Sequence, residues 1–448
     1  ILFINKLCFM TKLQQRRKRF KRILQPFQQF IRAETFSGIL LLFFTALALA
    51  WTNSSFRDSY FSLWHTKVNL GFGSFLLDEP LHFFINDGLM AVLFFILGLE
   101  IKMENLAGEL SSPTLAALPV IAALGGMLFP ALIYLAFNLG TPTVHGWGIP
   151  TATDIAFALG IMSLVGKKVP LGLKVFLAAL AIADDMGAVI VIAAFYSSGI
   201  TVFWLLTALA FFALQMLMNR LGVHKNPVYA ILGIGLWFAL WKTGIHPTIA
   251  GVLSAIAIPA RTKFINGNFT DSARHYLREY DNAPKTEDPL ITKEEQEALL
   301  GLVTISENAQ TPLQRIEHKL QPWVSYFIMP LFALANAGVE IGREISEAYS
   351  TPSTIGVMLG LFIGKPLGIT LFSYLSVKFR IASLPAGANW MSMLGTGAVA
   401  GIGFTMSIFI ANLAFGAESP FLSFAKIGIL SASLLSGLAG WLILRSSR

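Results

Sequence analysis

The sequence predicts an all-α membrane protein with about twelve transmembrane helices and one small β-hairpin. Of its 448 residues, 55% are hydrophobic and 13% are charged, and the mean hydropathy is +0.65. This composition leaves too little polar surface for a soluble chain of this length. The apolar residues are gathered into runs that approach the roughly 20 residues needed to cross a bilayer, and polar residues interrupt only a few of them. The length of the chain therefore indicates the number of membrane spans rather than the number of globular domains.

The candidate spans follow one another along almost the whole chain. They are residues 36–52, 82–104, 114–137, 147–165, 171–196, 202–219, 227–242, 246–260, 321–341, 353–377, 387–415 and 421–444. An even number places both termini on one side of the membrane. Lys and Arg are concentrated in the loops on that side, so the positive-inside rule predicts that both termini are cytoplasmic.

These spans divide the chain into four parts. They are a basic cytoplasmic segment at 1–35, a first membrane part at 36–260, a charged cytoplasmic insertion at 261–318 and a second membrane part at 319–448. The basic cluster after Met10 is typical of a topology anchor, and we expect the residues before it to be an upstream extension. The net charge of +8 does not indicate nucleic acid binding, because the basic residues lie in short loops and at the amino end.

Between the first two spans, residues 66–80 alternate apolar and polar side chains on either side of a glycine-containing turn. This pattern predicts an external β-hairpin. An isolated hairpin is marginal unless its edge is covered. Either the protein's own membrane domain or a second copy, in a homodimer, could cover it.

The insertion has the mixed charge of a solvated connector rather than of a regulatory module. Thr292 and Glu295 have the spacing of a capping box, which predicts a short helix near 293–309. The chain contains no nucleotide-binding loop, zinc-ligand spacing or hydrolase motif, so we expect no cofactor.

Two adjacent carboxylates, Asp184 and Asp185, stand in the middle of the run 171–196. A carboxylate near the bilayer centre costs about 2.5–3.5 kcal/mol on insertion scales. Because successive helical residues lie about 100° apart, the two carboxylates cannot both face one partner. We expect one to pair with a cation on another helix and the other to meet a water-filled cavity. The alternative is an internally paired doublet that only stabilises the fold.

Two other spans contain the signature of an interrupted helix. Pro150, Thr153 and Asp154 lie inside the run 147–165. The run 387–415 is interrupted by glycines, with the break around Thr396, Gly397, Gly401 and Gly403. Paired interrupted spans indicate a transport site, because exposed helix ends supply dipoles and free carbonyl groups. Glycines taken alone would indicate close helix packing.

A lysine also lies deep inside a span. Lys365 stands within the run 353–377, far enough from its ends that its amine cannot easily reach water. A buried cation needs an anion or exposed carbonyl groups as partner, and Asp184 or Asp185 is the candidate.

Together these residues resemble the NhaA-type sodium/proton antiporters of bacteria. The similarity covers roughly residues 35–445, through the motifs around Asp87, Glu100, Thr153-Asp154, Asp184-Asp185, His246, Gln321-Pro322-Trp323, Asn336 and Lys365. It implies twelve helices in inverted repeats, with two crossed, interrupted helices. It also implies electrogenic, pH-regulated exchange of H⁺ for Na⁺ or Li⁺ across the bacterial inner membrane.

The resemblance also implies roles for the buried polar residues. Asp185 would bind the Na⁺ ion with help from Thr153, and Asp184 would pair with Lys365. Asp154 and Lys365 would compensate the opposed dipoles of the interrupted helices.

The resemblance suggests an ion funnel and pH sensing near Glu100 and Glu104, which could instead be a solvated helix end. His246, Glu317 and His318 could tune activity, or could simply form hydrogen bonds at the membrane boundary. Gln321 stands where many members of the family carry His.

Other classes fit less well. An intramembrane aspartyl protease also uses two membrane aspartates, but it carries them on two helices with a Gly-x-Gly-Asp motif, which this chain lacks. The architecture of sodium/bile-acid symporters shares interrupted helices but does not require Lys365 and the aspartate doublet.

Overall fold

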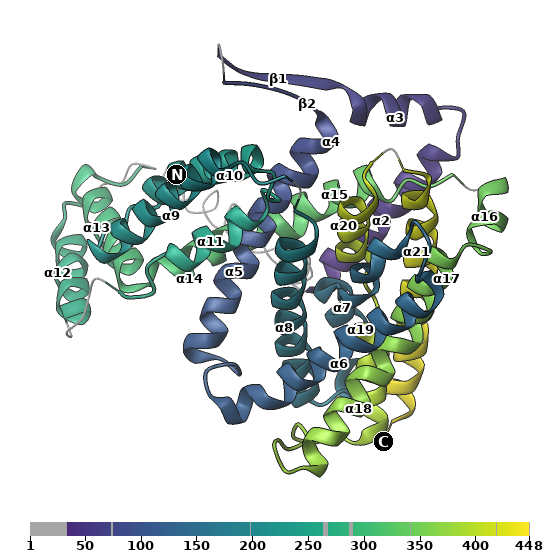
Figure 1. Cartoon of the computed structure of the whole chain (residues 1–448). Helices are drawn as coiled ribbons and strands as arrows, with labels where there is room; N and C mark the ends of the chain where they lie inside the picture. The colour runs from purple at the N-terminus through teal and green to yellow at the C-terminus, as the bar shows by residue number, and fades with distance from the viewer. Residues whose placement is uncertain are drawn as a thin grey trace, which may run out of the picture. The chain divides into compact units, whose positions relative to one another are not determined.

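The computed structural model describes residues 34–72, 75–197, 199–262, 268–285, 290–340, 342–417 and 419–447. The predicted basic segment, apart from its last two residues, lies outside them. The described chain is mostly helical, with one two-stranded antiparallel sheet, which confirms the helical class and the small hairpin but not the inverted repeats, which stay a prediction (Figure 1). It divides into two compact units. The first contains the described residues of Ile1–Ile85, Glu109–Ile192 and Ser325–Arg448, and the second contains Asn86–Gly108 and Ala193–Val324.

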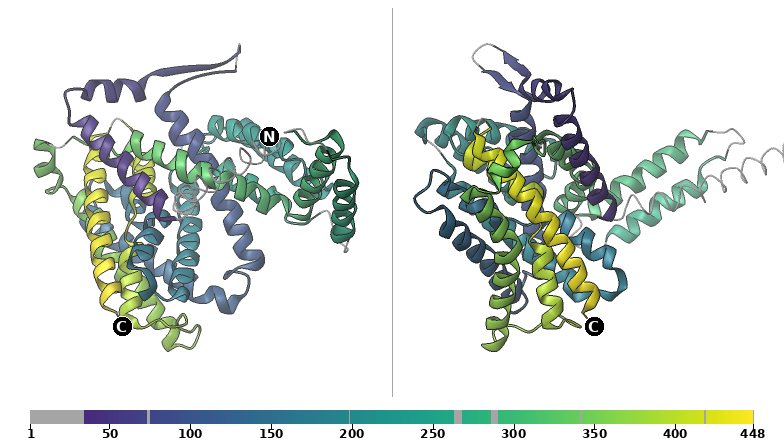
Figure 2. Two further views of the ribbon diagram at one scale, coloured as in Figure 1. Left: turned by 180° about the vertical axis from the view of Figure 1, so that it is seen from behind. Right: turned by 90° about the vertical axis from the view of Figure 1, so that its right-hand side faces the viewer.

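The first unit holds the aspartate doublet and both interrupted segments. Figure 2 shows the ribbon from two further sides. The helices of the first unit are α2 (Glu34–Thr52), α3 (Arg57–His65), α4 (Leu81–Phe83), α6 (Pro113–Asn138), α7 (Ile155–Val165), α8 (Leu171–Phe195, to Ile192), α15 (Met329–Asn336), α16 (Arg343–Ala348), α17 (Pro352–Leu359), α18 (Lys365–Lys378), α19 (Trp390–Ala400), α20 (Phe404–Phe415) and α21 (Pro420–Ser446). A 3₁₀ helix, η2 (Val144–Thr151), precedes α7, and a π-helical turn, η5 (Gly360–Gly364), precedes α18.

The predicted hairpin is present in this unit. Strand β1 (Lys67–Phe72) pairs with β2 (Phe75–Pro80), from Lys67 opposite Pro80 to Phe72 opposite Phe75. Lys67 Nζ lies 3.3 Å from Asp78 Oδ2 across the strands. Pairing of the hairpin with a second copy stays a prediction.

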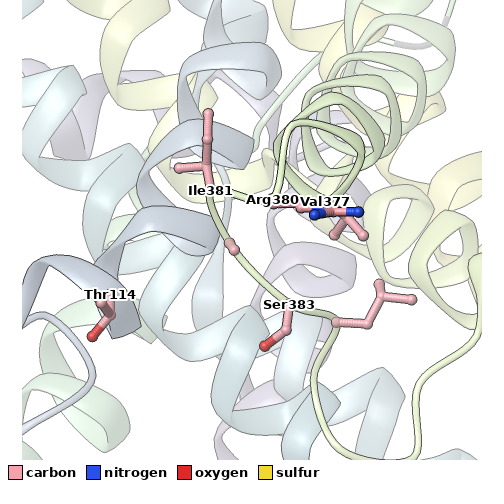
Figure 3. Close-up of a pocket in the computed structure, with 7 residues that line it drawn as sticks. Thr114, Val377, Arg380, Ile381 and Ser383 are labelled. Carbon is pink, nitrogen blue, oxygen red and sulfur yellow. The ribbon is translucent and has the colours of Figure 1, made fainter.

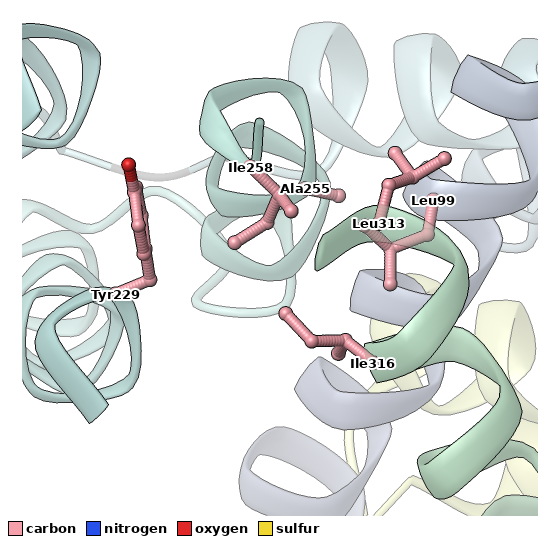
Figure 4. Packing of buried hydrophobic residues seen from close by; sticks show 6 residues of the cluster. All are labelled: Leu99, Tyr229, Ala255, Ile258, Leu313 and Ile316. Atoms are coloured by element: carbon pink, nitrogen blue, oxygen red, sulfur yellow. The ribbon is translucent and has the colours of Figure 1, made fainter. Parts of the chain in front are cut away.

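The second unit contains α5 (Met90–Ala107), α9 (Val202–Arg220), α10 (Asn226–Thr243), α11 (Ile249–Ala257), α12 (Asn268–Asn282), α13 (Lys293–Ala309) and α14 (Pro312–Trp323). Buried residues of α5, α10, α11 and α14 form one of its cores (Figure 4). They are Leu99, Tyr229, Ala255, Ile258, Leu313 and Ile316.

In the insertion, the predicted helix is present with its cap. The Thr292 hydroxyl accepts the N–H of Glu295, and the Glu295 carboxylate accepts the N–H of Thr292, at the start of α13. The sequence analysis did not predict α12, which packs along α13. Gly301 of α13 allows the ring of Tyr276 to approach, since a Cβ at Gly301 would lie 2.2 Å from that ring.

Two predicted spans differ from the helices observed. The run 246–260 contains only the nine residues of α11, because Ile258 is extended (φ −64°, ψ 134°) ahead of Pro259. The helix expected from 321 begins earlier, at Pro312, where the Thr311 hydroxyl caps the N–H of Gln314. A threonine followed by a proline at the first helical position is a local start signal that the span prediction did not use.

Among the described residues, seven helices are long and apolar enough to cross a membrane, and up to nine if each of two bent helix pairs is one span. The coarse prediction of a multi-pass helical membrane protein is confirmed, whereas the count of twelve spans stays a prediction.

Candidate functional site

The two interrupted segments contact each other at their breaks. One chain segment leaves η2 at Thr151, is extended at Ala152 and Asp154, and enters α7. The other leaves α19 at Ala400 and enters α20 at Phe404, with a bend of 47° between the two helices. The N–H of Asp154 donates to the carbonyl of Ile402 at 2.7 Å. Both predicted interruptions are therefore present, and they lie side by side.

Asp154 caps two helices at once. Its Oδ1 accepts the N–H of Phe157 in the first turn of α7 at 3.2 Å. Its Oδ2 accepts the N–H of Thr405, at the start of α20, also at 3.2 Å, and accepts the Thr405 hydroxyl. Helix N-termini carry partial positive charge, so one buried carboxylate serves both ends. The role of Thr405 was missed, although a polar residue directly after a glycine break could have indicated it.

Asp184, Lys365 and Thr153 form a buried cluster. Asp184 is 1% exposed and Lys365 is 0% exposed. The Lys365 amine pairs with Asp184 Oδ2 and donates to the Thr153 hydroxyl at 2.8 Å. That hydroxyl lies 2.8 Å from Asp184 Oδ2 and 3.0 Å from the carbonyl oxygen of Ala400, and its one proton can serve only one of them at a time. Asp184 Oδ1 has no hydrogen-bond partner among the described residues.

Close backbone packing brings Lys365 to this position. Gly368 of α18 meets Gly125 of α6, and a Cβ at Gly368 would lie 2.1 Å from the Gly125 carbonyl oxygen. The turn before Lys365 widens into the π-helix η5, because Pro366 has no N–H and its ring crowds the preceding turn. The amine is consequently aimed at the break between η2 and α7.

Asp185 lies next to Asp184 on α8 and is also buried, at 2% exposed. Successive helical residues point about 100° apart, so its carboxylate leaves the helix in a different direction from that of Asp184. The hydrogen bonds of Thr153 described above go to Asp184 and Ala400. The predicted partnership of Thr153 with Asp185 around an ion stays a prediction.

The residues of the second break mainly allow close packing. The Thr396 hydroxyl donates to the carbonyl of Ser392 in its own helix, at 2.8 Å. Gly397 lies against the backbone of Pro366, Gly401 against the carbonyl of Leu361, and Gly403 against Ala152. These glycines hold the break against the segments that carry Lys365 and Thr153.

In the second unit, three predicted carboxylates are near one another. Glu100 and Glu104 are one turn apart on α5, and Glu317 lies on α14, which packs on α5 through the core in Figure 4. The carboxylates of Glu317 and Glu104 both act electrostatically on Glu100. His318, beside Glu317, is exposed.

His246 has a partner that the sequence analysis missed. Its Nε2 lies 3.1 Å from Asp87 Oδ1, and its Nδ1 lies 2.8 Å from the Thr248 hydroxyl. Asp87 and His246 are far apart in the sequence and follow no shared spacing. Only the folded structure shows that the two side chains meet.

Comparisons of the sequence with known proteins find relatives over nearly the whole chain. The sequence profile of the family described as Na⁺/H⁺ antiporter 1 matches residues 28–444. The chain is 50% identical over 426 residues to the Na⁺/H⁺ antiporter NhaA of Oleidesulfovibrio alaskensis, covering 95% of this chain and 94% of that protein. It is 48% identical over 420 residues to the NhaA of Helicobacter pylori, covering 93% and 94%. It is 48% identical over 422 residues to that of Koribacter versatilis, covering 94% and 91%.

None of these relatives supports the protease alternative. The profile match, over residues 28–444, spans both interrupted segments, the aspartate doublet and Lys365. The chain belongs to the Na⁺/H⁺ antiporter 1 family.

Proposed function

We propose that this protein is a secondary transporter that exchanges Na⁺, or Li⁺, for H⁺ across the bacterial inner membrane, and that it serves sodium and pH homeostasis. The observation that carries the proposal is the buried group of Asp184, Lys365 and Thr153 at the meeting point of two interrupted helices, beside Asp185. Ionisable residues inside membrane spans are costly and mark ion pathways in transporters.

Competition for one site couples the two ions. The Asp185 carboxylate holds either a proton or a small cation, and the oxygens of Thr153 and of the broken backbone complete the cation's shell. The site switches between access from one side of the membrane and access from the other when it is loaded with protons or with Na⁺. It does not switch when it is empty and charged. Electrogenic exchange needs unequal numbers of protons and Na⁺ ions in each cycle.

Lys365 and Asp154 compensate the other charges near the site, which are the Asp184 carboxylate and the partial charges of the helix ends. Lys365 neutralises Asp184 as a buried pair, so the pair adds no net charge to the site. Asp154 offsets the positive ends of α7 and α20, at which it accepts backbone N–H groups. Each interrupted helix can then keep exposed ends within the membrane.

Residues of the second unit regulate access and pH response in this proposal. Glu100, Glu104 and Glu317 form the cytoplasmic ion funnel, and His318 and His246 respond to pH. The twelve spans, the cytoplasmic location of both termini and a homodimer joined through the β-hairpin complete the proposal.

The test uses inverted membrane vesicles with an imposed proton gradient. Addition of Na⁺ or Li⁺ should collapse the gradient for the native protein, whereas K⁺ should not. Asp185→Asn should abolish this response while the protein remains folded and inserted. The matched control is Asp281→Asn, which removes one exposed carboxylate from α12 and should leave the response unchanged. Exchange by Asp185→Asn at a comparable rate and apparent affinity would exclude Asp185 as the ion site.

A further inference from the structure

A pocket of about 460 Å³ lies at the end of α18, within the first unit (Figure 3). Thr114, in the first turn of α6, lines one side. Val377, Arg380 and the loop 381–384 line the rest. The lining therefore combines one guanidinium, two hydroxyls and several aliphatic side chains, and it contains no carboxylate.

Arg380 occupies a backbone position that usually belongs to glycine. Its φ is +58°, and it is the one non-glycine residue with positive φ in the described part of the chain. It follows the last turn of α18, where the N–H of Ile381 donates to the carbonyl of Ser376 at 2.9 Å. This is the left-handed position of a helix C-cap, which glycine fills at the lowest cost. The chain instead places a long cationic side chain there.

The Arg380 side chain has no internal partner. Across the described ranges, its guanidinium makes no ion pair, hydrogen bond or ring contact. Neighbouring cations differ: Lys378 Nζ lies 6.0 Å from the centre of the Tyr374 ring, and the Arg445 guanidinium lies 4.9 Å from that of Trp441. Arg380 is thus an exposed cation that lines an open pocket and has no partner among the described residues.

The same end of the unit is strongly basic. The loop after α18 packs on the start of α8, where Gly387 touches Pro170. Lys168 Nζ donates to the carbonyl of Arg445 at 3.3 Å. The stretches 166–174, 377–390 and 441–447 contain six Lys or Arg residues and no Asp or Glu, whereas the segment that leads to Thr114 contains one carboxylate, Glu109. The six are Lys167, Lys168, Lys174, Lys378, Arg380 and Arg445.

Aromatic side chains at this end of the unit are of the kind typical of a membrane boundary. Tyr374 and Trp390 meet edge to face with their ring centres 5.3 Å apart, and Trp441 lies on α21. Trp and Tyr accompanied by Lys and Arg are typical of the interface between hydrocarbon and water, at the depth of lipid phosphates. An anionic partner at this depth is a phospholipid headgroup.

We propose that this pocket binds the phosphate group of an anionic phospholipid. Arg380 pairs with the phosphate oxygens, and the hydroxyl of Ser383 on the neighbouring loop donates to them. Val377, Ile381 and Leu384 contact the glycerol and the first methylene groups. The site is separate from the ion site, so it does not depend on the exchange mechanism. In the proposed topology it faces the cytoplasmic leaflet, where juxtamembrane basic residues attract anionic lipids.

The experiment measures the melting temperature of the full-length protein in detergent while phosphatidylglycerol is titrated in. Phosphatidylcholine and inorganic phosphate are titrated in parallel. Phosphatidylglycerol should raise the melting temperature of the native protein, phosphatidylcholine should do so less, and inorganic phosphate alone should not. The effect should weaken as salt is added.

Two variants distinguish lipid binding in the pocket from a general attraction of anionic lipid to positive charge. Arg380→Gly removes the guanidinium and keeps the turn, because glycine readily adopts positive φ. Lys378→Gln removes one cation two residues away that does not line the pocket. Loss of a charge-assisted hydrogen-bonded pair should raise the lipid concentration for half the shift about tenfold in Arg380→Gly. Lys378→Gln should stay close to the native value.

Three outcomes would overturn the proposal. The first is an unchanged lipid response in Arg380→Gly. The second is an equal loss in Arg380→Gly and Lys378→Gln, which would indicate only a diffuse effect of positive charge. The third is a shift that inorganic phosphate reproduces and phosphatidylglycerol does not, which would make the ligand a soluble phosphate.

Discussion

Removal of the Lys365 amine should act mainly by lowering the stability of the folded protein. The amine and the Asp184 carboxylate are both buried, and the Thr153 hydroxyl is the other group hydrogen-bonded to both. Lys365→Ala leaves a buried carboxylate with one hydroxyl as its remaining described partner. Breaking a buried ion pair in this way costs about 3–5 kcal/mol, against about 0–1 kcal/mol for an exposed pair. We expect a clear fall in the melting temperature in detergent.

The double change should recover much of this loss. Asp184→Asn with Lys365→Gln removes both charges and keeps two amides that can form hydrogen bonds with each other and with Thr153. A cycle of Asp184→Asn, Lys365→Gln and the double variant should give a coupling free energy of about 2–3 kcal/mol. The control is Lys378→Gln on the same helix, whose exposed amine makes no ion pair with a described residue and whose loss should change stability little.

A coupling free energy near zero would refute this reasoning. It would mean that Lys365 and Asp184 do not stabilise each other, and that Asp185 or the carbonyl groups of the helix ends are the energetic partners of Lys365. A strong coupling combined with residual exchange in the double variant would show that Lys365 is a structural partner of Asp184 rather than an obligatory proton carrier.

Three further perturbations test other parts of the structure. Deletion of residues 265–288 removes α12 but leaves the capped α13, so Na⁺-driven gradient collapse in vesicles should persist, with at most a shifted pH dependence; complete loss in a well-inserted deletion would contradict the connector interpretation. Gly368→Ala should destabilise the protein by about 1–3 kcal/mol, because the new Cβ meets α6 backbone, whereas Gly160→Ala, with nothing within 4 Å of its Cβ, should be neutral or slightly stabilising in the same melting assay. The hydrogen bond and charge of Lys319, with the charge of Arg315, hold the pKa of Glu307 below its usual range. The stabilisation that these ion pairs give to the contact of α13 with α14 is therefore fully present above the unfolded pKa of about 4.3, and it is lost as pH falls through the lowered pKa. The protection factors of the amide groups in α13 and α14 should therefore stay constant from neutral pH down to about pH 5 and fall in stronger acid, and Glu307→Gln should remove that step; an unaltered acid step in Glu307→Gln would assign it to another group.

Much of the fold follows from local sequence signals. The capping box at Thr292 and Glu295 predicted the start of α13, because a cap is decided by residues three positions apart. Alternating side chains predicted the hairpin, and Pro150 with Asp154 predicted the first helix break. Helix α12 was missed because its mixed charge resembles that of a solvated connector. Its sequence nevertheless carries a local helical signal, since Phe269, Ala273, Tyr276 and Tyr280 follow the spacing of one helix face.

The sequence by itself determined which groups are costly to bury: two adjacent carboxylates, a lysine and an interrupted backbone in apolar spans. The family resemblance implied that Asp184 pairs with Lys365, but only the tertiary structure shows that contact, and only it reveals the contact of Asp154 with Thr405. Lys365 and Asp184 are 181 residues apart, and Asp154 and Thr405 are 251 apart. No periodicity or spacing encodes such pairs, because they depend on how closely the helices approach. That approach is set by the contact of Gly125 with Gly368, and by the π-helical turn that aims Lys365 at the break.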